Sequence, residues 1–205
     1  MAVLSVFAVP YFAEATQLLD VTVNNDTLCG SGGCYGLSYE LIITDANDAD
    51  NTTYTAAIKI TGTYTGALPF ISAVDFKLAN TITSATLTAA PGGTATWLTA
   101  TNVGQAAGDC VGHGNGFVCS ADIDPNNGAP TGANLNYEWD YTFNTSSTLA
   151  FGHLGACFDI ATNSPGGPCV SISSVPEPST LILLGSGLII LAAAARRFGP
   201  VDRQG

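Results

Sequence analysis

Apolar and polar side chains alternate along several segments of this chain, most clearly in NYEWDYTF at residues 136–143. One side of this segment carries only aromatic residues, which are Tyr137, Trp139, Tyr141 and Phe143. The other side carries only polar residues, which are Asn136, Glu138, Asp140 and Thr142. A period of two is typical of a β-strand with one buried face. The same period recurs at residues 35–43, 54–61 and 74–78.

Turn residues separate these segments, and no helical period appears before Ser179. The turns are Pro91-Gly92-Gly93, Asn126-Asn127-Gly128 and Pro165-Gly166-Gly167-Pro168. We therefore expect residues 16–173 to form one all-β domain, an antiparallel β-sandwich or jelly roll of about 8–10 strands. Each sheet should have one buried face and one Thr-rich face in water.

The segment from Ser179 to Ala195 contains no charged residue. As a helix it would span roughly 25 Å, which is enough to cross the hydrocarbon core of a membrane with little tilt. We therefore expect a single C-terminal transmembrane helix after the β domain. Arg196 and Arg197 follow this segment, so the positive-inside rule places the tail in the cytoplasm and the β domain outside. A buried core helix is the alternative, which the lack of a polar face disfavours.

A proline-rich segment, Val175-Pro176-Glu177-Pro178, precedes this apolar span. Each proline fixes its own φ and holds the residue before it in an extended conformation. We expect a stiff, extended spacer at the membrane surface, of a shape that a membrane-embedded processing enzyme could grip. The Val-Pro-Glu-Pro segment, the apolar span with Gly and Ala and the Arg pair occur in this order within residues 175–197. In this order and spacing they resemble the PEP-CTERM sorting signal.

The resemblance implies a bacterium with an outer membrane and a membrane enzyme, exosortase, that recognises the signal. It implies that residues 174–205 form the signal, with the motif at 176–178, the helix at 179–195 and the basic cluster at 196–197. The precursor would sit transiently in the inner membrane and then be released toward the cell surface and its exopolysaccharide. Exosortase and exopolysaccharide are therefore the partners that the resemblance implies.

The first residues also indicate export. MAVLSVFAVPY is apolar, and Ala13-Glu14-Ala15 fits a small-x-small cleavage site before Thr16, so residues 1–15 are expected to be the later part of a signal peptide that the secretion translocon recognises. The positively charged start of such a peptide is missing, since no Lys or Arg precedes Lys59. A buried first strand is the alternative.

Six cysteines fall in three close pairs, with Gly-rich spacers in each. The pairs are Cys29 with Cys34, Cys110 with Cys119, and Cys157 with Cys169. Several pairings are open in principle, and local disulfides across the loop-like spacers are the simplest choice. A zinc site that combines cysteines with His113 and His153 is the alternative, and an oxidising destination favours disulfides instead.

Charge excludes nucleic acid as a partner. The whole chain has a formal net charge of −11, and within residues 16–173 the only cations are Lys59 and Lys77. Such a field repels phosphates.

Catalytic motifs are also missing, since no Gly-x-Ser-x-Gly elbow, phosphate loop or His-Glu-x-x-His motif occurs. Glu138 and Asp140 could serve a glycosidase, but they alternate with aromatic residues on the side of a strand that should face solvent. We expect no enzyme and no cofactor.

A bound calcium ion is the one possible exception to the expectation of no cofactor. Asp122, Asp124 and Asn126 are spaced two apart, like oxygen ligands in a calcium loop. An EF-hand would need its Gly one position before Gly128 and a Glu at Ala133. The acidic turn from Asp45 to Asp50 is similar, and both turns are equally consistent with solvated loops.

Two functions remain open after these exclusions. The first is a non-catalytic cell-surface or extracellular-matrix component associated with exopolysaccharide. The second is a secreted carbohydrate-binding or carbohydrate-active module, stabilised by calcium or not, for which the aromatic residues are the only indication. The positions of Trp97 and Trp139, on a concave surface or in the core, distinguish the two.

Overall fold

The computed structural model describes residues 17–23, 29, 33–46, 52–78, 81–106, 109–123, 128–159 and 167–173. The chain divides between Ser173 and Ser174 into two units, and all described residues belong to the first. They form eleven strands and one 3-10 turn: β1 (Gln17–Val23), β2 (Leu37–Asp45), β3 (Thr53–Gly62), β4 (Phe70–Lys77), β5 (Ser84–Ala89), η2 (Thr94–Thr96), β6 (Trp97–Ala106), β7 (Asp109–Asp122), β8 (Ala129–Pro130), β9 (Leu135–Asn144), β10 (His153–Asp159) and β11 (Cys169–Ser173).

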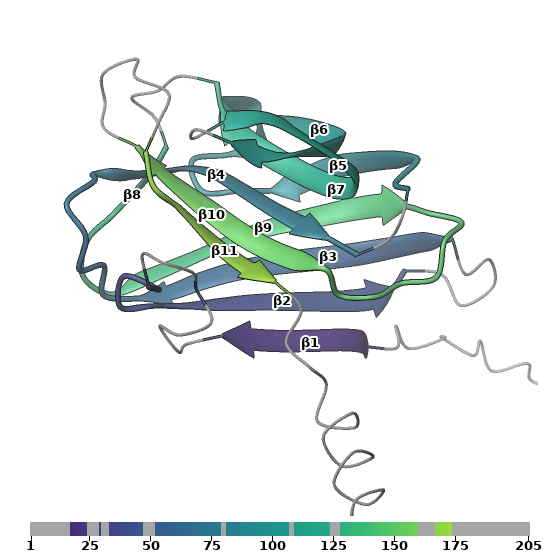
Figure 1. Ribbon diagram of the computed structural model, residues 1–205, viewed down its shortest axis with the longest axis horizontal. Coiled ribbons are helices and arrows are strands. Elements are labelled where there is room, and N and C mark those ends of the chain that lie inside the picture. Colours follow the sequence, from purple (N-terminus) through teal and green to yellow (C-terminus); the bar gives the residue numbers. More distant parts are fainter. Residues whose placement is uncertain are drawn as a thin grey trace, which may run out of the picture. The chain divides into compact units, whose positions relative to one another are not determined.

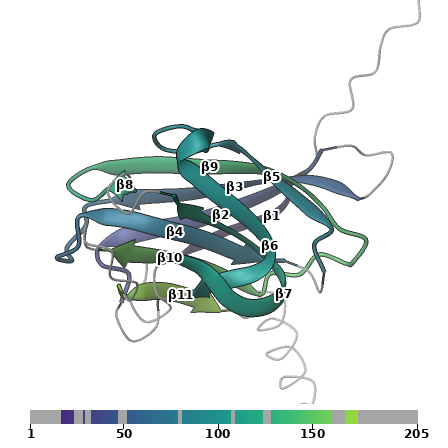
Figure 2. The same cartoon turned by 90° about the horizontal axis from the view of Figure 1, so that it is seen from above.

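The strands form two sheets that lie face to face (Figures 1 and 2). Sheet A has the order β1-β2-β3-β9-β5, and sheet B has the order β11-β10-β4-β7-β6 with β8 beside β4. Every strand pairing is antiparallel. The expected all-β antiparallel sandwich is therefore confirmed.

Aromatic side chains join the two sheets. Phe76 of sheet B lies 5.3 Å from Tyr141 and 5.7 Å from Phe143 of sheet A, measured between ring centroids. Trp97 of sheet B meets Trp139 of sheet A edge to face at 5.4 Å. Burial of each such side chain stabilises the fold by about 1.5–3 kcal/mol. The alternating segment at 136–143 is thus β9, whose aromatic side faces sheet B.

Sheet B is buried on both faces in its centre, which corrects the expectation of one wet face for each sheet. In β4 six consecutive residues, from Ile71 to Phe76, are buried, and Asp75 is only 1% exposed although it faces away from sheet A. On this outer face Ala73, Ala121 and Cys157 form a small second core, against which Cys110 packs. The expectation of one wet face therefore holds for sheet A alone.

The hairpin of β6 and β7 provides this cover by curling back over sheet B. Thr101 pairs with Val118, but Val103 pairs with His113, so residues 114–117 of β7 stand opposite Asn102 alone, which is an insertion of three residues in the ladder. Nine residues of straight strand would span about 30 Å, yet the Cα atoms of Cys110 and Cys119, nine positions apart, lie 5.7 Å from each other. The strand must therefore fold back at the insertion. The Gly-rich spacer between these cysteines, expected to be a loop, is this folded strand.

Asn102 holds the bend of the hairpin in place. Its φ of 56° lies in the left-handed region, which Asn tolerates better than most residues. Its side-chain carbonyl accepts hydrogen bonds from the backbone N–H groups of Ile82 (3.2 Å) and Gly116 (2.9 Å), and its side-chain amide donates to the carbonyl of Ile82 at 2.8 Å. One side chain thus connects β6, the insertion in β7 and the segment before β5.

Smaller differences from the sequence analysis have local causes. Eleven strands exceed the expected 8–10 partly because β8 has only two residues, too few to show a period. Tyr35 lies in a turn with a φ of 52° rather than in a strand, so the alternating segment begins two residues later, at Leu37. The expected transmembrane helix at 179–195 lies outside the described residues, among which no helix is long and apolar enough to cross a membrane.

Replacing Asn102 should test its role as a clamp. We expect Asn102→Ala to lower the free energy of unfolding by about 2–4 kcal/mol, because two backbone N–H groups and one carbonyl lose their partner and Ala disfavours a left-handed φ. Asn102→Gly should lower it by about 1 kcal/mol less, since Gly tolerates this φ. Urea titration of both variants measures the difference. A loss below about 0.5 kcal/mol for Asn102→Ala, the usual range of surface changes, would show that the clamp is dispensable.

Candidate functional site

The expected sorting segment lies outside the described residues, so its residues are known from the sequence only. This applies to Val175, Pro176, Glu177 and Pro178 and to Arg196 and Arg197. The described chain stops at Ser173, the last residue of β11, an edge strand that pairs only with β10 among the described strands. The expected signal peptide at 1–15 also lies outside them, and β1 begins soon after it, at Gln17.

All six cysteines form disulfides, in the three local pairs that their spacing indicates. The bonds are Cys29–Cys34, Cys110–Cys119 and Cys157–Cys169. The second closes the bend of β7, and the third joins directly opposite positions of β10 and β11. No thiol remains free, which leaves no thiolate for the zinc alternative.

The candidate calcium loop is only partly described. Asp122 is the last residue of β7, whereas Asp124 and Asn126 lie outside the described residues. Asp45, at the start of the second acidic turn, ends β2 and is buried. Within the part of the chain that is described, no group of three His, Cys, Asp or Glu side chains could hold a metal ion. A calcium site thus remains a prediction.

Both tryptophans lie in the core and form no aromatic surface for a ligand. Trp97 is 4% exposed and Trp139 is fully buried. The indole N–H of Trp97 donates to the carbonyl of Pro91 at 2.9 Å. This arrangement removes the observation that favoured a carbohydrate module with an aromatic platform.

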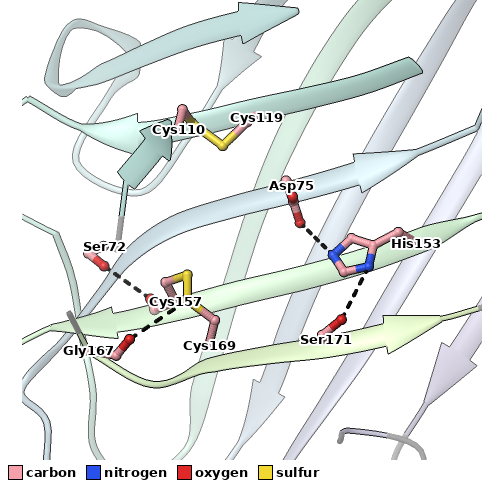
Figure 3. The surroundings of a disulfide bond; sticks show 9 residues. All are labelled: Ser72, Asp75, Cys110, Cys119, His153, Cys157, Gly167, Cys169 and Ser171. Carbon is pink, nitrogen blue, oxygen red and sulfur yellow. Dashed lines mark hydrogen bonds and ion pairs between the residues drawn. A yellow bond between two sulfur atoms is a disulfide. The ribbon is translucent and has the colours of Figure 1, made fainter. Parts of the chain in front are cut away.

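A polar cluster that sequence reasoning missed lies on the outer face of sheet B (Figure 3). Asp75 and Ser171 are the partners of Gly155 on either side, in β4 and β11. Because Gly155 has no side chain, the ring of His153, two positions earlier on the same face, reaches both. His153 Nε2 lies 3.0 Å from Asp75 Oδ1, and Ser171 Oγ lies 3.4 Å from His153 Nδ1.

This cluster contains the residue types of a Ser-His-Asp triad, but its geometry points to a structural role. The contact between Ser171 and His153 is long for a hydrogen bond to a hydroxyl. The contact between His153 and Asp75 is shorter and supplies a partner for a carboxylate that is 1% exposed, which would otherwise be costly to bury. The ring of Phe117, 5.4 Å from that of His153, covers the pair from β7. The alternation at residues 74–78 puts Asp75 at an ordinary polar position, so the sequence did not indicate that this side chain is buried.

Sheet A presents the open face of the domain, and its side chains form rows across the strands. Thr44, Thr55, Thr142 and Thr86 are successive partners in β2, β3, β9 and β5, and we call them the threonine row. The next row contains Ile42, Ala57 and Asp140. The row after it contains Glu40, Lys59 and Glu138, in which Lys59 and Glu138 form an ion pair at 3.7 Å.

A shallow hollow of about 250 Å³ lies where the threonine row meets the row of Ala57. Ala57 leaves the space because its two neighbours in the row, Ile42 and Asp140, have longer side chains. Thr88, on the edge strand β5, also lines the hollow and donates to the backbone carbonyl of Asp140 at 3.1 Å. Partial burial, and secondarily the nearby Glu138 carboxyl, raise the pKa of Asp140 above its ordinary value, while Lys59 acts in the opposite direction.

The disulfide that closes the bend of β7 should stabilise the domain. In the chain-entropy model, a loop of this size contributes about 2–3 kcal/mol, so the double variant Cys110→Ala, Cys119→Ala should lose about this much. Cys29→Ala with Cys34→Ala, which opens a shorter loop, should lose about 2 kcal/mol and serves as the matched comparison. Urea titration measures both losses, and non-reducing peptide mapping of the parent tests the pairing. A peptide that links Cys110 to any cysteine other than Cys119 would contradict it.

The raised pKa of Asp140 should make stability depend on pH. Because this pKa is higher in the folded protein than in the unfolded chain, the folded protein binds more protons between the two values, and stability falls as the pH rises through that interval. Asp140→Asn removes the effect, so the variant should gain Tm relative to the parent at pH 7 but not at pH 3, below the ordinary Asp pKa of about 4. Glu138→Gln removes the second cause of the raised pKa, the Glu138 carboxylate, so it should narrow the pH interval over which stability falls. An equal difference in Tm between parent and Asp140→Asn at both pH values would refute this account.

Comparison with known protein families yields a match on the segment that follows β11. Residues 174–197 match the family model described as the PEP-CTERM protein-sorting motif. No curated protein and no solved structure matches the chain. The match covers the proline-rich segment, the apolar span and the Arg pair, and it confirms the resemblance found in the sequence. The chain therefore carries a PEP-CTERM sorting motif, which marks it as an exported protein that exosortase processes and directs toward the cell surface.

Proposed function

We propose that this protein is a non-catalytic component of the cell surface or extracellular matrix, associated with exopolysaccharide after exosortase releases it. The observation that carries the proposal is the sorting motif at residues 174–197, which directly follows a β-sandwich with three disulfides. Disulfides persist in oxidising compartments outside the cytoplasm. The destination implied by the motif and the chemistry of the domain thus agree.

A structural rather than catalytic role is supported by how the reactive side chains are used. His153 is engaged with the buried Asp75, and Glu138 is paired with Lys59. Both tryptophans contribute to the core between the sheets. Each of these side chains thus has a structural role in the sandwich or on its surface, and none of these contacts requires a catalytic function.

Residues 174–205 act in this proposal as a temporary handle. The apolar span 179–195 holds the precursor in the inner membrane, and Arg196 and Arg197 keep its end in the cytoplasm. The sandwich then lies on the periplasmic side. Pro176 and Pro178 hold the segment before the span extended, so that an enzyme can bind it with little further loss of conformational entropy. A permanent anchor would not need such a spacer.

Replacing Pro176-Glu177-Pro178 with Ala-Ala-Ala should separate insertion from release. Insertion should continue, because the apolar span is unchanged, whereas release should stop and the full-length chain should accumulate in the inner membrane. The measurement is the intact mass of the surface or medium form and of the membrane form, in a host with an exosortase and in one without it.

Two controls make this experiment decisive. Thr180→Ala changes a residue within the matched segment but leaves Pro176-Glu177-Pro178 intact, and it should be released like the parent. The host without exosortase should retain the parent at full length. If the parent reaches the surface still carrying Leu181 to Arg197, or if the triple alanine variant is released normally, the apolar span is only an anchor.

A further inference from the structure

The outer face of sheet A differs from that of sheet B because no other segment of the described chain covers its centre. Residues of β2, β3 and β9 alternate along each strand between buried positions and partly exposed ones. The partly exposed positions form the threonine row and the two rows beside it. This face is therefore the broad sheet surface that the domain offers to a partner.

The hollow on this face combines three kinds of chemical group within one space. Ile42 and Ala57 provide an apolar floor, Asp140 provides a carboxylate, and Thr44, Thr55 and Thr88 provide hydroxyls. A carboxylate only accepts hydrogen bonds, whereas a hydroxyl both donates and accepts. A sugar ring has complementary groups, since its C–H face is apolar and its rim carries hydroxyls that donate and accept.

Charge restricts which sugar polymer the face can bind. Four carboxylates lie on this face, from Asp20, Glu40, Glu138 and Asp140, against the single cation Lys59, which is already paired with Glu138. A surface of this sign repels anionic chains. The face therefore disfavours anionic polymers and is compatible with a neutral one.

The shape of the hollow favours one unit of a chain over a separate small molecule. Its volume of about 250 Å³ lies below the roughly 300–1,000 Å³ of pockets that enclose small molecules. It continues into the threonine row, where the side chains of Thr44 and Thr55 are hydrogen-bonded to each other. Beyond that row, Thr53 donates to Asn144 at 2.8 Å and Asn144 donates to Ser84 at 2.9 Å. Polar groups therefore extend across several strands, as a bound chain would require.

We propose that the outer face of sheet A binds a neutral polysaccharide, with one sugar ring over Ala57 and its hydroxyls on Asp140 and the threonine row. This inference rests on the proposed function, because it names the class of exopolysaccharide and the surface that holds it. Each contact is weak by itself, because the face is exposed to solvent. Several contacts along one polymer together give a higher overall affinity.

The test is retention of the purified full chain on insoluble polysaccharides. The chain is kept soluble in a non-ionic detergent that has no sugar headgroup, because a sugar headgroup would compete for the hollow. The neutral probes are cellulose, cross-linked dextran and mannan, and the anionic probe is covalently cross-linked alginate, used without calcium. Ala57→Trp fills the hollow, and Asp140→Asn removes the carboxylate. Thr61→Trp is the matched control, because it adds the same ring on the same face of β3, outside the residues that line the hollow.

We expect retention on at least one neutral polymer and none on alginate. Ala57→Trp should abolish retention, and Asp140→Asn should weaken it roughly tenfold, as expected for loss of a charge-assisted hydrogen bond. Thr61→Trp should bind like the parent, and a single cooperative thermal unfolding transition in each variant should show that the variants fold. Retention on alginate alone, retention on none of the polymers, or normal retention of Ala57→Trp would overturn the inference.

This result and the sorting experiment can fail independently. Retention of the purified chain does not depend on exosortase, so a failure of release with normal retention would reject the sorting role and leave the binding face intact. Normal release without retention would reject the binding face alone.

Discussion

The burial of Asp75 is the constraint on which the arrangement of sheet B depends. A carboxylate on a central strand that is 1% exposed requires a partner and a cover, because an unpaired buried charge is very costly. His153 provides the partner at 3.0 Å, and the curled β6–β7 hairpin provides the cover. An added Cβ at Gly104 of that hairpin would lie 3.5 Å from Asp75 Oδ2, so the hairpin backbone approaches the carboxylate closely. The Cys110–Cys119 bond and the Asn102 side chain both act to keep the hairpin in this position.

This cover gives the two sheets different roles. The hairpin uses the outer face of sheet B for a second small core of Ala73, Ala121 and Cys157. Sheet A keeps a face of hydroxyls and carboxylates in contact with solvent. A sandwich with two similar solvent-exposed faces would offer partners two competing surfaces, whereas this domain offers one broad, predominantly acidic face. The outer face of sheet A carries the carboxylates of Asp20, Glu40, Glu138 and Asp140.

Much of the fold could be predicted from the sequence because alternation is a local property. It identified β2, β3, β4 and β9, and the even number of closely spaced cysteines indicated the three disulfides. Alternation did not identify β7, where Gly residues and a ladder insertion remove the period. It also did not predict that Asp75 is buried, because this burial depends on a hairpin tens of residues away in the sequence. The hollow over Ala57 could not be predicted either, because the row of Ile42, Ala57 and Asp140 exists only once the register of three strands is known.

The position of the last disulfide connects the domain to its sorting segment. β11 is an edge strand of five residues, held by β10 alone among the described strands, and the matched motif begins at the residue that follows it. Any force that a membrane enzyme exerts on the motif therefore acts first on β11. Backbone hydrogen bonds of a short edge strand separate easily, since each contributes only about 1 kcal/mol net. The Cys157–Cys169 bond links the start of β11 covalently to β10, so the strand can fray from Ser173 but cannot leave the sheet. His153 lies on β10 opposite the fraying end, and its partner Asp75 remains covered from the other side by the β6–β7 hairpin.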